Sequence, residues 1–81
     1  MNERTITVNT SFDSAAAAQI VQQASRFKSR ISLVAAEKTA NAKSIMGIIS
    51  MELKGGSTLT IIADGEDEQS ALSELENILG G

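Results

Sequence analysis

The chain has 81 residues, of which 42% are hydrophobic and 21% are charged, and its formal net charge is −3. A chain of this length forms one small domain that buries about 60% of its unfolded surface, too little for a deep cleft between two domains. The sequence contains neither cysteine nor histidine. A disulfide framework, a thiolate metal site and the commonest general base are therefore excluded, and we expect neither an enzyme nor a metal or cofactor.

The charges are separated along the chain. Residues 1–44 contain six Lys and Arg against three Asp and Glu, whereas residues 45–81 contain one against seven. An acidic chain with only two aromatic residues, Phe12 and Phe27, is a poor candidate for direct nucleic-acid binding. No apolar run approaches the roughly 20 residues of a membrane span, and the N-terminus lacks the apolar segment of a signal peptide. We therefore expect a cytoplasmic protein.

The first part of the chain predicts a strand, a helix and a second strand. Residues 4–8 alternate polar and apolar side chains, which is typical of a half-buried strand. The alanine-rich segment 14–28 repeats apolar residues at helical spacing, and Asp13 or Ser14 can cap its N-terminus. Residues 31–34 then read as a short strand.

The second part predicts two strands and two helices. Residues 39–42 indicate a weaker strand, and Ser44 then caps a short helix that ends at about residue 50 or 51. Residues 57–63 are rich in β-branched side chains and give the clearest strand. Asp67 can cap a last helix with regularly spaced apolar residues. The order βαββαβα favours a single α+β domain over residues 1–81, with an antiparallel sheet and helices on one face.

The segment Asn-Ala-Lys-Ser-Ile-Met-Gly at residues 41–47 carries the most information. Together with Gly-Glu-Asp-Glu-Gln at 65–69 and Ala-Leu at 71–72, it resembles the phosphocarrier HPr family of the phosphoenolpyruvate-dependent sugar phosphotransferase system. The resemblance covers about residues 19–79 and is nearest to the Crh-like members, which lack the active-site histidine. It implies the HPr-like open-faced sandwich, a four-stranded antiparallel sheet with three helices packed on one face.

The N-terminal loop departs from that family pattern. In HPr a Gly-Ile-His-Ala-Arg-Pro-Ala type motif carries the histidine that accepts phosphate from enzyme I, and its arginine holds the phosphoryl oxygens. Ungapped alignment places Asp13 at the histidine position and Ala15 at the arginine position. We therefore assign no catalytic residue and predict a protein that is not a histidine phosphocarrier.

Asp13 leaves an alternative open, because carboxylates form acyl phosphates in some covalent phosphoryl enzymes. A degenerate phosphotransfer component would use Asp13 as its phosphoryl acceptor. Against this, a carboxylate is a weaker nucleophile than imidazole, and Ala15 provides no guanidinium to offset negative charge. A solvated helix N-cap is the simpler interpretation of Asp13.

Ser44 is the candidate site of regulatory phosphorylation, as the resemblance implies. A phosphate there would add about −1.5 to −2 charge at a helix N-terminus, where free amides and the helix dipole favour an anion. Lys43 adds a neighbouring cation. On its position alone, Ser44 is better explained as an ordinary N-cap, and the assignment of phosphorylation depends on the resemblance.

The helix after Ser44 is too short to bury all of its apolar residues. Some of them must therefore be exposed, and the resemblance implies that the outward ones form a partner-binding surface, which comprises Lys43, Ile45, Met46 and Ile49, whereas Ile48 faces the core. The competing explanation is that the following segment or a second subunit covers these side chains.

The resemblance also implies partners for this surface. They are the bifunctional HPr kinase/phosphorylase and a LacI-type catabolite control repressor, which would place the chain in carbon catabolite repression. Arg26 or Lys28 can contribute charge at the rim of the surface. A further alternative is an adaptor that binds proteins through the same helix without any phosphorylation.

Overall fold

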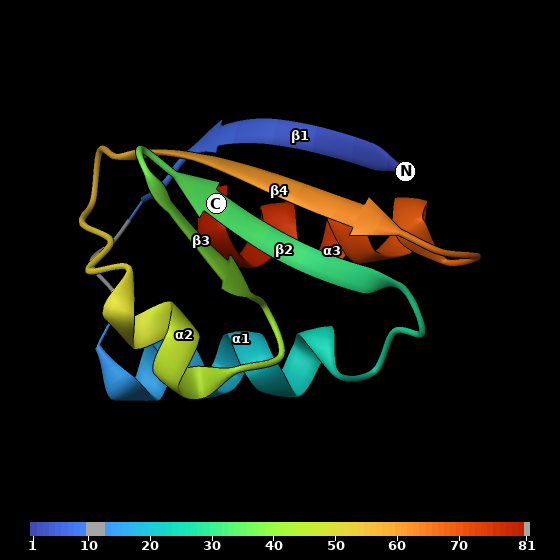
Figure 1. The fold of residues 1–81 in the computed structure, drawn as a ribbon, viewed down its shortest axis with the longest axis horizontal. Coiled ribbons are helices and arrows are strands. Elements are labelled where there is room, and N and C mark those ends of the chain that lie inside the picture. Colours follow the sequence, from blue (N-terminus) through green and yellow to red (C-terminus); the bar gives the residue numbers. More distant parts are fainter. Residues whose placement is uncertain (10–12, 81) are drawn as a thin grey trace.

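The computed structural model describes residues 1–9 and 13–80. Within these residues one sheet is covered on one face by helices, as Figure 1 shows, and the other face of the sheet is open. The predicted order and the predicted α+β class are confirmed. The elements in chain order are β1 (Asn2–Thr7), α1 (Ser14–Ala24), β2 (Arg30–Ala35), β3 (Lys38–Asn41), α2 (Ile45–Ser50), β4 (Thr58–Asp64) and α3 (Glu68–Gly80).

The sheet of the described residues has the strand order β1-β4-β2-β3, and all of its pairs are antiparallel. Strand β4 therefore pairs on both sides, with Ile61 opposite Arg4 of β1 and Leu33 of β2. This central position explains why β4 has the strongest strand signal in the sequence. Its alternate residues Leu59, Ile61 and Ala63 are fully buried and face the helices.

The core lies between the helix-covered face of the sheet and the inner sides of α1, α2 and α3. Helices α1 and α3 each contribute a stripe of small or aliphatic side chains at helical spacing, α2 contributes Ile48, and the sheet contributes alternate residues. Its fully buried larger side chains are Val8, Ile20, Ile31, Leu33, Ile48, Leu59, Ile61, Leu72, Leu75 and Leu79. No helix of the described residues is long and apolar enough to cross a membrane.

Helix α1 ends at Ala24, earlier than the predicted residue 28. The next residues form a turn, in which the backbone N–H of Arg26 donates to Gln23 and that of Phe27 donates to Ala24, each at 3.2 Å. The chain must leave the helix here because Ser29, which starts the approach to β2, is fully buried against the beginning of α3. The sequence prediction for this boundary was wrong for that reason.

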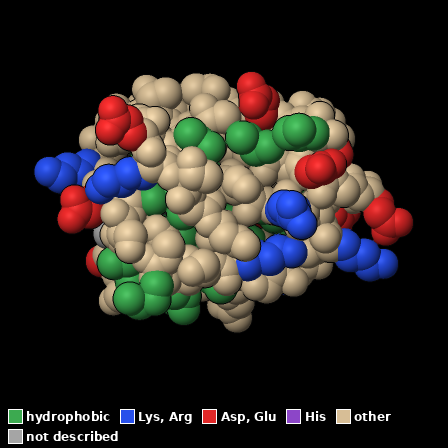
Figure 2. All heavy atoms as spheres, viewed as in Figure 1, with side chains coloured by type: hydrophobic (Ala, Val, Ile, Leu, Met, Phe, Trp, Pro, Cys, Tyr) green, Lys and Arg blue, Asp and Glu red, His purple; other side chains and the backbone are tan. Residues whose placement is uncertain are grey.

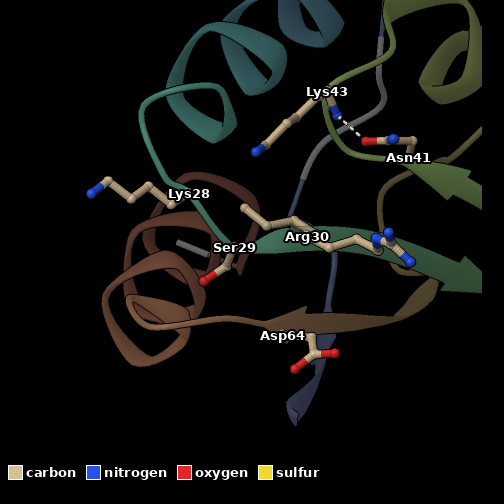
Figure 3. A pocket seen from close by; sticks show the side chains of 7 residues that line it. Lys28, Ser29, Arg30, Asn41, Lys43 and Asp64 are labelled. Atoms are coloured by element: carbon tan, nitrogen blue, oxygen red, sulfur yellow. Dashed lines mark hydrogen bonds between the residues drawn. The ribbon is translucent and has the colours of Figure 1, made fainter.

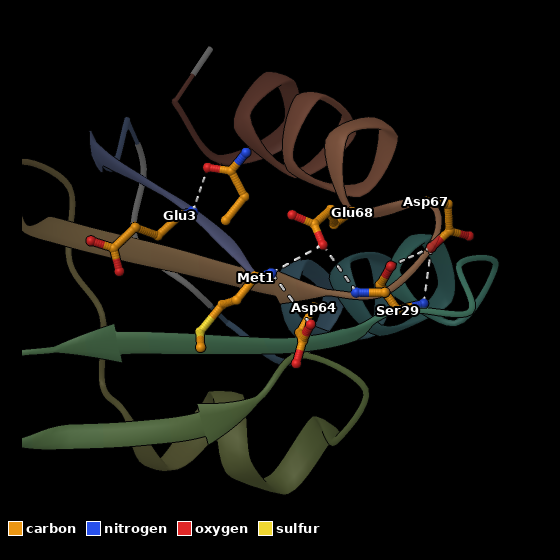
Figure 4. A network of polar contacts seen from close by, with 8 residues as sticks. Met1, Glu3, Ser29, Asp64, Asp67 and Glu68 are labelled. Atoms are coloured by element: carbon orange, nitrogen blue, oxygen red, sulfur yellow. Dashed lines mark hydrogen bonds and ion pairs between the residues drawn. The ribbon is translucent and has the colours of Figure 1, made fainter.

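The carboxylate of Asp67 holds Ser29 against the beginning of α3 (Figure 4). It accepts hydrogen bonds from the backbone N–H of Lys28 at 2.8 Å and of Ser29 at 2.9 Å, and also from the Ser29 hydroxyl. Asp67 does precede α3, as predicted, but these hydrogen bonds join its carboxylate to the two residues directly before β2 and do not cap α3. The Ser29 hydroxyl, followed by the Lys28 amide, lowers the pKa of Asp67 to about 2.

The hairpin between β2 and β3 has a two-residue turn, with Ala35 opposite Lys38. Ala36 in this turn has φ 55°, a left-handed conformation that glycine adopts without strain and alanine does not. Strand β3 ends at Asn41, one residue before the predicted end, and the N–H of the buried Ala42 still donates to the Ile31 carbonyl of β2 at 3.0 Å.

Candidate functional site

Ser44 is the N-cap of α2, as the sequence predicted. Its backbone is extended, with φ −120° and ψ 113°, and its Oγ accepts a hydrogen bond from the backbone N–H of Gly47 at 3.2 Å. The Ser44 carbonyl accepts the first bond of the helix, from Ile48 at 3.1 Å. The Ser44 side chain is half-buried, so its hydroxyl is ordered by the helix start without being enclosed by the core.

Gly47 leaves room beside this hydroxyl. A Cβ atom built on Gly47 would lie 3.3 Å from Ser44 Oγ and 3.4 Å from the Cβ of Ala40. Both distances are close to the limit of ordinary packing contacts, so a side chain at this position would press on the hydroxyl and on β3. The glycine of the Asn-Ala-Lys-Ser-Ile-Met-Gly segment therefore has a steric role at the site.

The loop before Ser44 is fixed by Asn41 and Lys43. The Oδ1 atom of Asn41 accepts the backbone N–H of Lys43 at 2.8 Å, as drawn in Figure 3, and the carbonyl of Asn41 accepts the backbone N–H of Ser44 at 3.0 Å. The ammonium of Lys43 donates to the carbonyl of Phe27 at 2.8 Å. Lys43 thus binds the turn after α1, a contact between distant segments that the sequence alone did not reveal.

The apolar residues of α2 divide as expected. Ile48 is fully buried, whereas Met46 is 73% exposed, Ile45 41% and Ile49 39%. Figure 2 shows hydrophobic side chains gathered over the α2 corner of the molecule. Apart from Met1, these three are the exposed large hydrophobic residues among those described. The expected orientation is confirmed, and partner binding by this surface stays a prediction.

Asp13 is the N-cap of α1, with its Oδ1 accepting the backbone N–H of Ala16 at 2.9 Å. Ala15, in the first turn of α1, is exposed. The predicted capping role of Asp13 is confirmed. Residues 10–12, including Phe12, lie outside the described part of the chain. Among the described residues, no group of three or more acidic, histidine or cysteine residues is arranged to hold a metal ion.

Comparison with known proteins links this arrangement to one family. The family profile described as "PTS HPr component phosphorylation site" matches residues 2–80. The HPr-like protein Crh of Bacillus subtilis is 44% identical over 70 residues, which are 86% of this chain and 82% of that protein. The phosphocarrier protein HPr of Treponema pallidum is 50% identical over 62 residues, which are 76% of this chain and 70% of that protein.

Solved structures agree with the sequence comparison. A phosphocarrier protein HPr from Bacillus anthracis superimposes with a TM-score of 0.92 at 36% identity, covering 96% of this chain and 95% of that one. The structure of Bacillus subtilis Crh gives a TM-score of 0.79 at 44% identity, covering 88% of this chain and 82% of that one. That structure is described as a catabolite repression protein and an intertwined dimer with a swapped domain. The open-faced sandwich with its helices on one face is therefore confirmed, and the chain belongs to the HPr family of the phosphotransferase system.

Proposed function

We propose that this chain is a Crh-like regulatory member of the HPr family, switched by phosphorylation of Ser44, and not a histidine phosphocarrier. The observation that carries the proposal is the Ser44 hydroxyl at the start of α2, directly before the exposed Ile45, Met46 and Ile49. The 81 residues contain no histidine. The relatives that match most of this chain include Crh proteins of two bacteria, which supports a regulatory role within the family.

The kinase step transfers the γ-phosphoryl group of ATP to Ser44. The bond from phosphorus to Oγ forms, the bond to ADP breaks, and the hydroxyl proton passes to a base of the kinase. In the unmodified protein Oγ accepts the N–H of Gly47 at 3.2 Å. A phosphate at the same place keeps acceptor oxygens beside the free amides of the first turn of α2, which favour an anion.

The phosphorylated form would then bind a LacI-type catabolite control repressor. The partner-binding surface of Lys43, Ile45, Met46 and Ile49 would supply apolar contacts centred on Met46, whose flexible thioether side chain adapts to a partner. The new phosphate would add charge-assisted hydrogen bonds from basic residues of the repressor. The affinity for the repressor would therefore depend on phosphorylation of Ser44. The apolar contacts alone would give the same affinity in both forms of the chain.

Biolayer interferometry with immobilised repressor tests the proposal. We expect the phosphorylated chain to bind at least about 10-fold tighter than the unmodified chain, the effect of one or two added charge-assisted bonds. Met46→Asp should abolish this binding, whereas Ser73→Asp, which adds the same charge on the exposed side of α3, should not. Equal binding of the two forms would indicate a phosphorylation-independent adaptor and contradict the switch.

A further inference from the structure

A polar hollow of about 580 Å³ lies where β2 begins, β4 ends and the chain passes from β3 to α2 (Figure 3). Its polar lining consists of Lys28, Ser29, Arg30, Asn41, Lys43 and Asp64. The exposed Ile45, Met46 and Ile49 are not among its lining residues. It is therefore a feature separate from the partner-binding surface, although Lys43 belongs to both.

The residues that line the hollow carry a net positive charge in an acidic protein, although the carboxylates of Glu66 and Asp67 contact Lys28 and Ser29 at its edge. Three of its side chains are cationic and one is a carboxylate, which leaves two net positive charges, whereas the whole chain carries −3. The carboxylate of Asp64 lies 3.4 Å from the ammonium group of Met1, which offsets part of its charge. A concave surface lined by one sign of charge concentrates the potential and attracts ions of the other sign.

The cations of the hollow are weakly compensated within the described residues. Lys28 has one ion pair, 3.8 Å from Glu66, and both side chains are highly exposed, so the pair contributes little. Lys43 donates to the Phe27 carbonyl, and Arg30 has no recorded ion pair or side-chain hydrogen bond among residues 1–9 and 13–80. Arg30 and Lys43 therefore retain N–H donors for a ligand.

The donors around the hollow are also partly fixed in place. The bond to Phe27 holds the ammonium of Lys43 and leaves two of its N–H groups. The Asn41 side chain uses its oxygen on the Lys43 backbone N–H, which leaves its amide NH₂ as a donor. A guanidinium fork, an ammonium and an amide each suit phosphoryl oxygens, and because the Lys43 ammonium and the Arg30 guanidinium are directed to opposite sides of the hollow (Figure 3), they would bind different oxygens of a ligand.

We propose that this hollow binds a small phosphorylated metabolite, with its phosphoryl group on Arg30, Lys43 and Asn41. The hollow is larger than one phosphate group, so it leaves space for the rest of such a molecule or for a second phosphoryl group near Lys28. Because Lys43 directly precedes Ser44, a ligand in the hollow would contact the residue next to the N-cap of α2. The proposal does not depend on phosphorylation of Ser44.

Titration of the ¹⁵N-labelled full chain, followed by NMR at constant ionic strength, tests this site. Pyrophosphate is the main probe, inorganic phosphate the minimal one, and succinate the dicarboxylate comparison. We expect saturable shifts of the backbone amides of residues 28–31 and 41–43, with pyrophosphate bound about 10-fold tighter than succinate. Arg30→Gln should weaken pyrophosphate binding about 10-fold, as expected for a lost charge-assisted contact.

Two variants complete the experiment. Lys43→Gln should weaken binding to a similar degree, whereas Lys54→Gln removes the same charge at an exposed position outside the hollow and should leave affinity unchanged. Arg30 is exposed and outside the core, so its variant remains informative if Lys43→Gln disturbs the fold. Shifts that do not saturate, equal affinity for succinate, or the same affinity in Arg30→Gln and Lys54→Gln would each overturn the proposal.

Discussion

The buried hydroxyl of Ser29 donates a hydrogen bond to the carboxylate of Asp67 and so ties the start of β2 to the start of α3. The junction leaves no space for a side chain at Gly65, where a Cβ atom would lie 2.6 Å from Ser29 Oγ. Gly65 also has φ 157° and donates its N–H to Glu68 at 3.2 Å. The hydrogen bond between Ser29 and Asp67 therefore fixes the end of the sheet beside the polar hollow.

Ser29→Ala tests the contribution of this junction to stability. We expect the free energy of unfolding at pH 7 to fall by about 1.5–3 kcal/mol, because one hydrogen bond to a charged group is lost. Urea unfolding followed by circular dichroism measures the change. Ser73→Ala on the exposed side of α3 is the matched control and should stay within about 0.5 kcal/mol of the parent.

The same junction predicts an acid dependence. The pKa of Asp67 is lowered from 3.8 to about 2 in the folded chain, so its ionised form stabilises the fold fully above 3.8. That stabilisation is lost as the pH falls from about 4 to 2, where the folded carboxyl becomes protonated. Asp67→Asn should show a shallower loss of stability over this window in urea unfolding. Parallel curves for parent and variant would contradict the assigned role.

Ala36→Gly is expected to stabilise the chain. Ala36 has φ 55° in the β2–β3 turn, and relief of that strain should exceed the entropy cost of a more flexible unfolded chain, with a net gain of about 0.5–1 kcal/mol. Ala35→Gly, inside β2, makes the same chemical change and should instead destabilise by about 0.5–1 kcal/mol. Thermal unfolding of the pair checks the difference, and a less stable Ala36→Gly chain would refute it.

Substitutions at two positions of α2 should distinguish a residue that stabilises the fold from one that is available for partner binding. Ile48 is fully buried and Met46 is 73% exposed. We expect Ile48→Ala to cost about 2–4 kcal/mol of unfolding free energy, and Met46→Ala to stay within about 0.5 kcal/mol of the parent. Urea unfolding measures both. A large loss in Met46→Ala would show that this side chain is structural and would remove it from the proposed partner surface.

The sequence predicted most of the fold because the relevant signals are local. The alternation of Leu59 and Ile61 is enough to recognise β4. The shortness of α2 indicates that some of its apolar residues are exposed, and the family resemblance separated Ile48 from Met46. The end of α1 was not predictable in this way. It depends on Asp67, which lies 38 residues beyond Ser29 in the chain and meets it only after folding.

At the candidate site, too, local features were predictable from the sequence and contacts between distant residues were not. The capping positions of Asp13 and Ser44 were readable from residue type and the neighbouring helix pattern. The contact between Lys43 and the Phe27 carbonyl joins segments 16 residues apart, and no pattern in either segment indicates it. The polar hollow likewise brings together residues 28–31, residues 41–43 and Asp64, and no pattern in the sequence indicates that these three parts of the chain meet.

Enzyme I with phosphoenolpyruvate tests whether Asp13 has phosphoryl chemistry. Its carboxylate caps α1 through the Ala16 N–H, and the exposed Ala15 supplies no cation. We therefore expect no transfer above background. An acid-stable, hydroxylamine-sensitive label that disappears in Asp13→Asn would contradict this expectation and support a degenerate phosphotransfer component.

Mapping of the phosphorylated residue by mass spectrometry, after incubation with HPr kinase/phosphorylase and ATP, tests the central claim most directly. Ser50→Ala is the matched control, because Ser50 is the exposed serine at the other end of α2 and bonds to the Met46 carbonyl at 2.8 Å. We predict one phosphate on Ser44, retained in Ser50→Ala and absent in Ser44→Ala. An unmodified chain, or equal labelling of Ser44→Ala, would contradict the account.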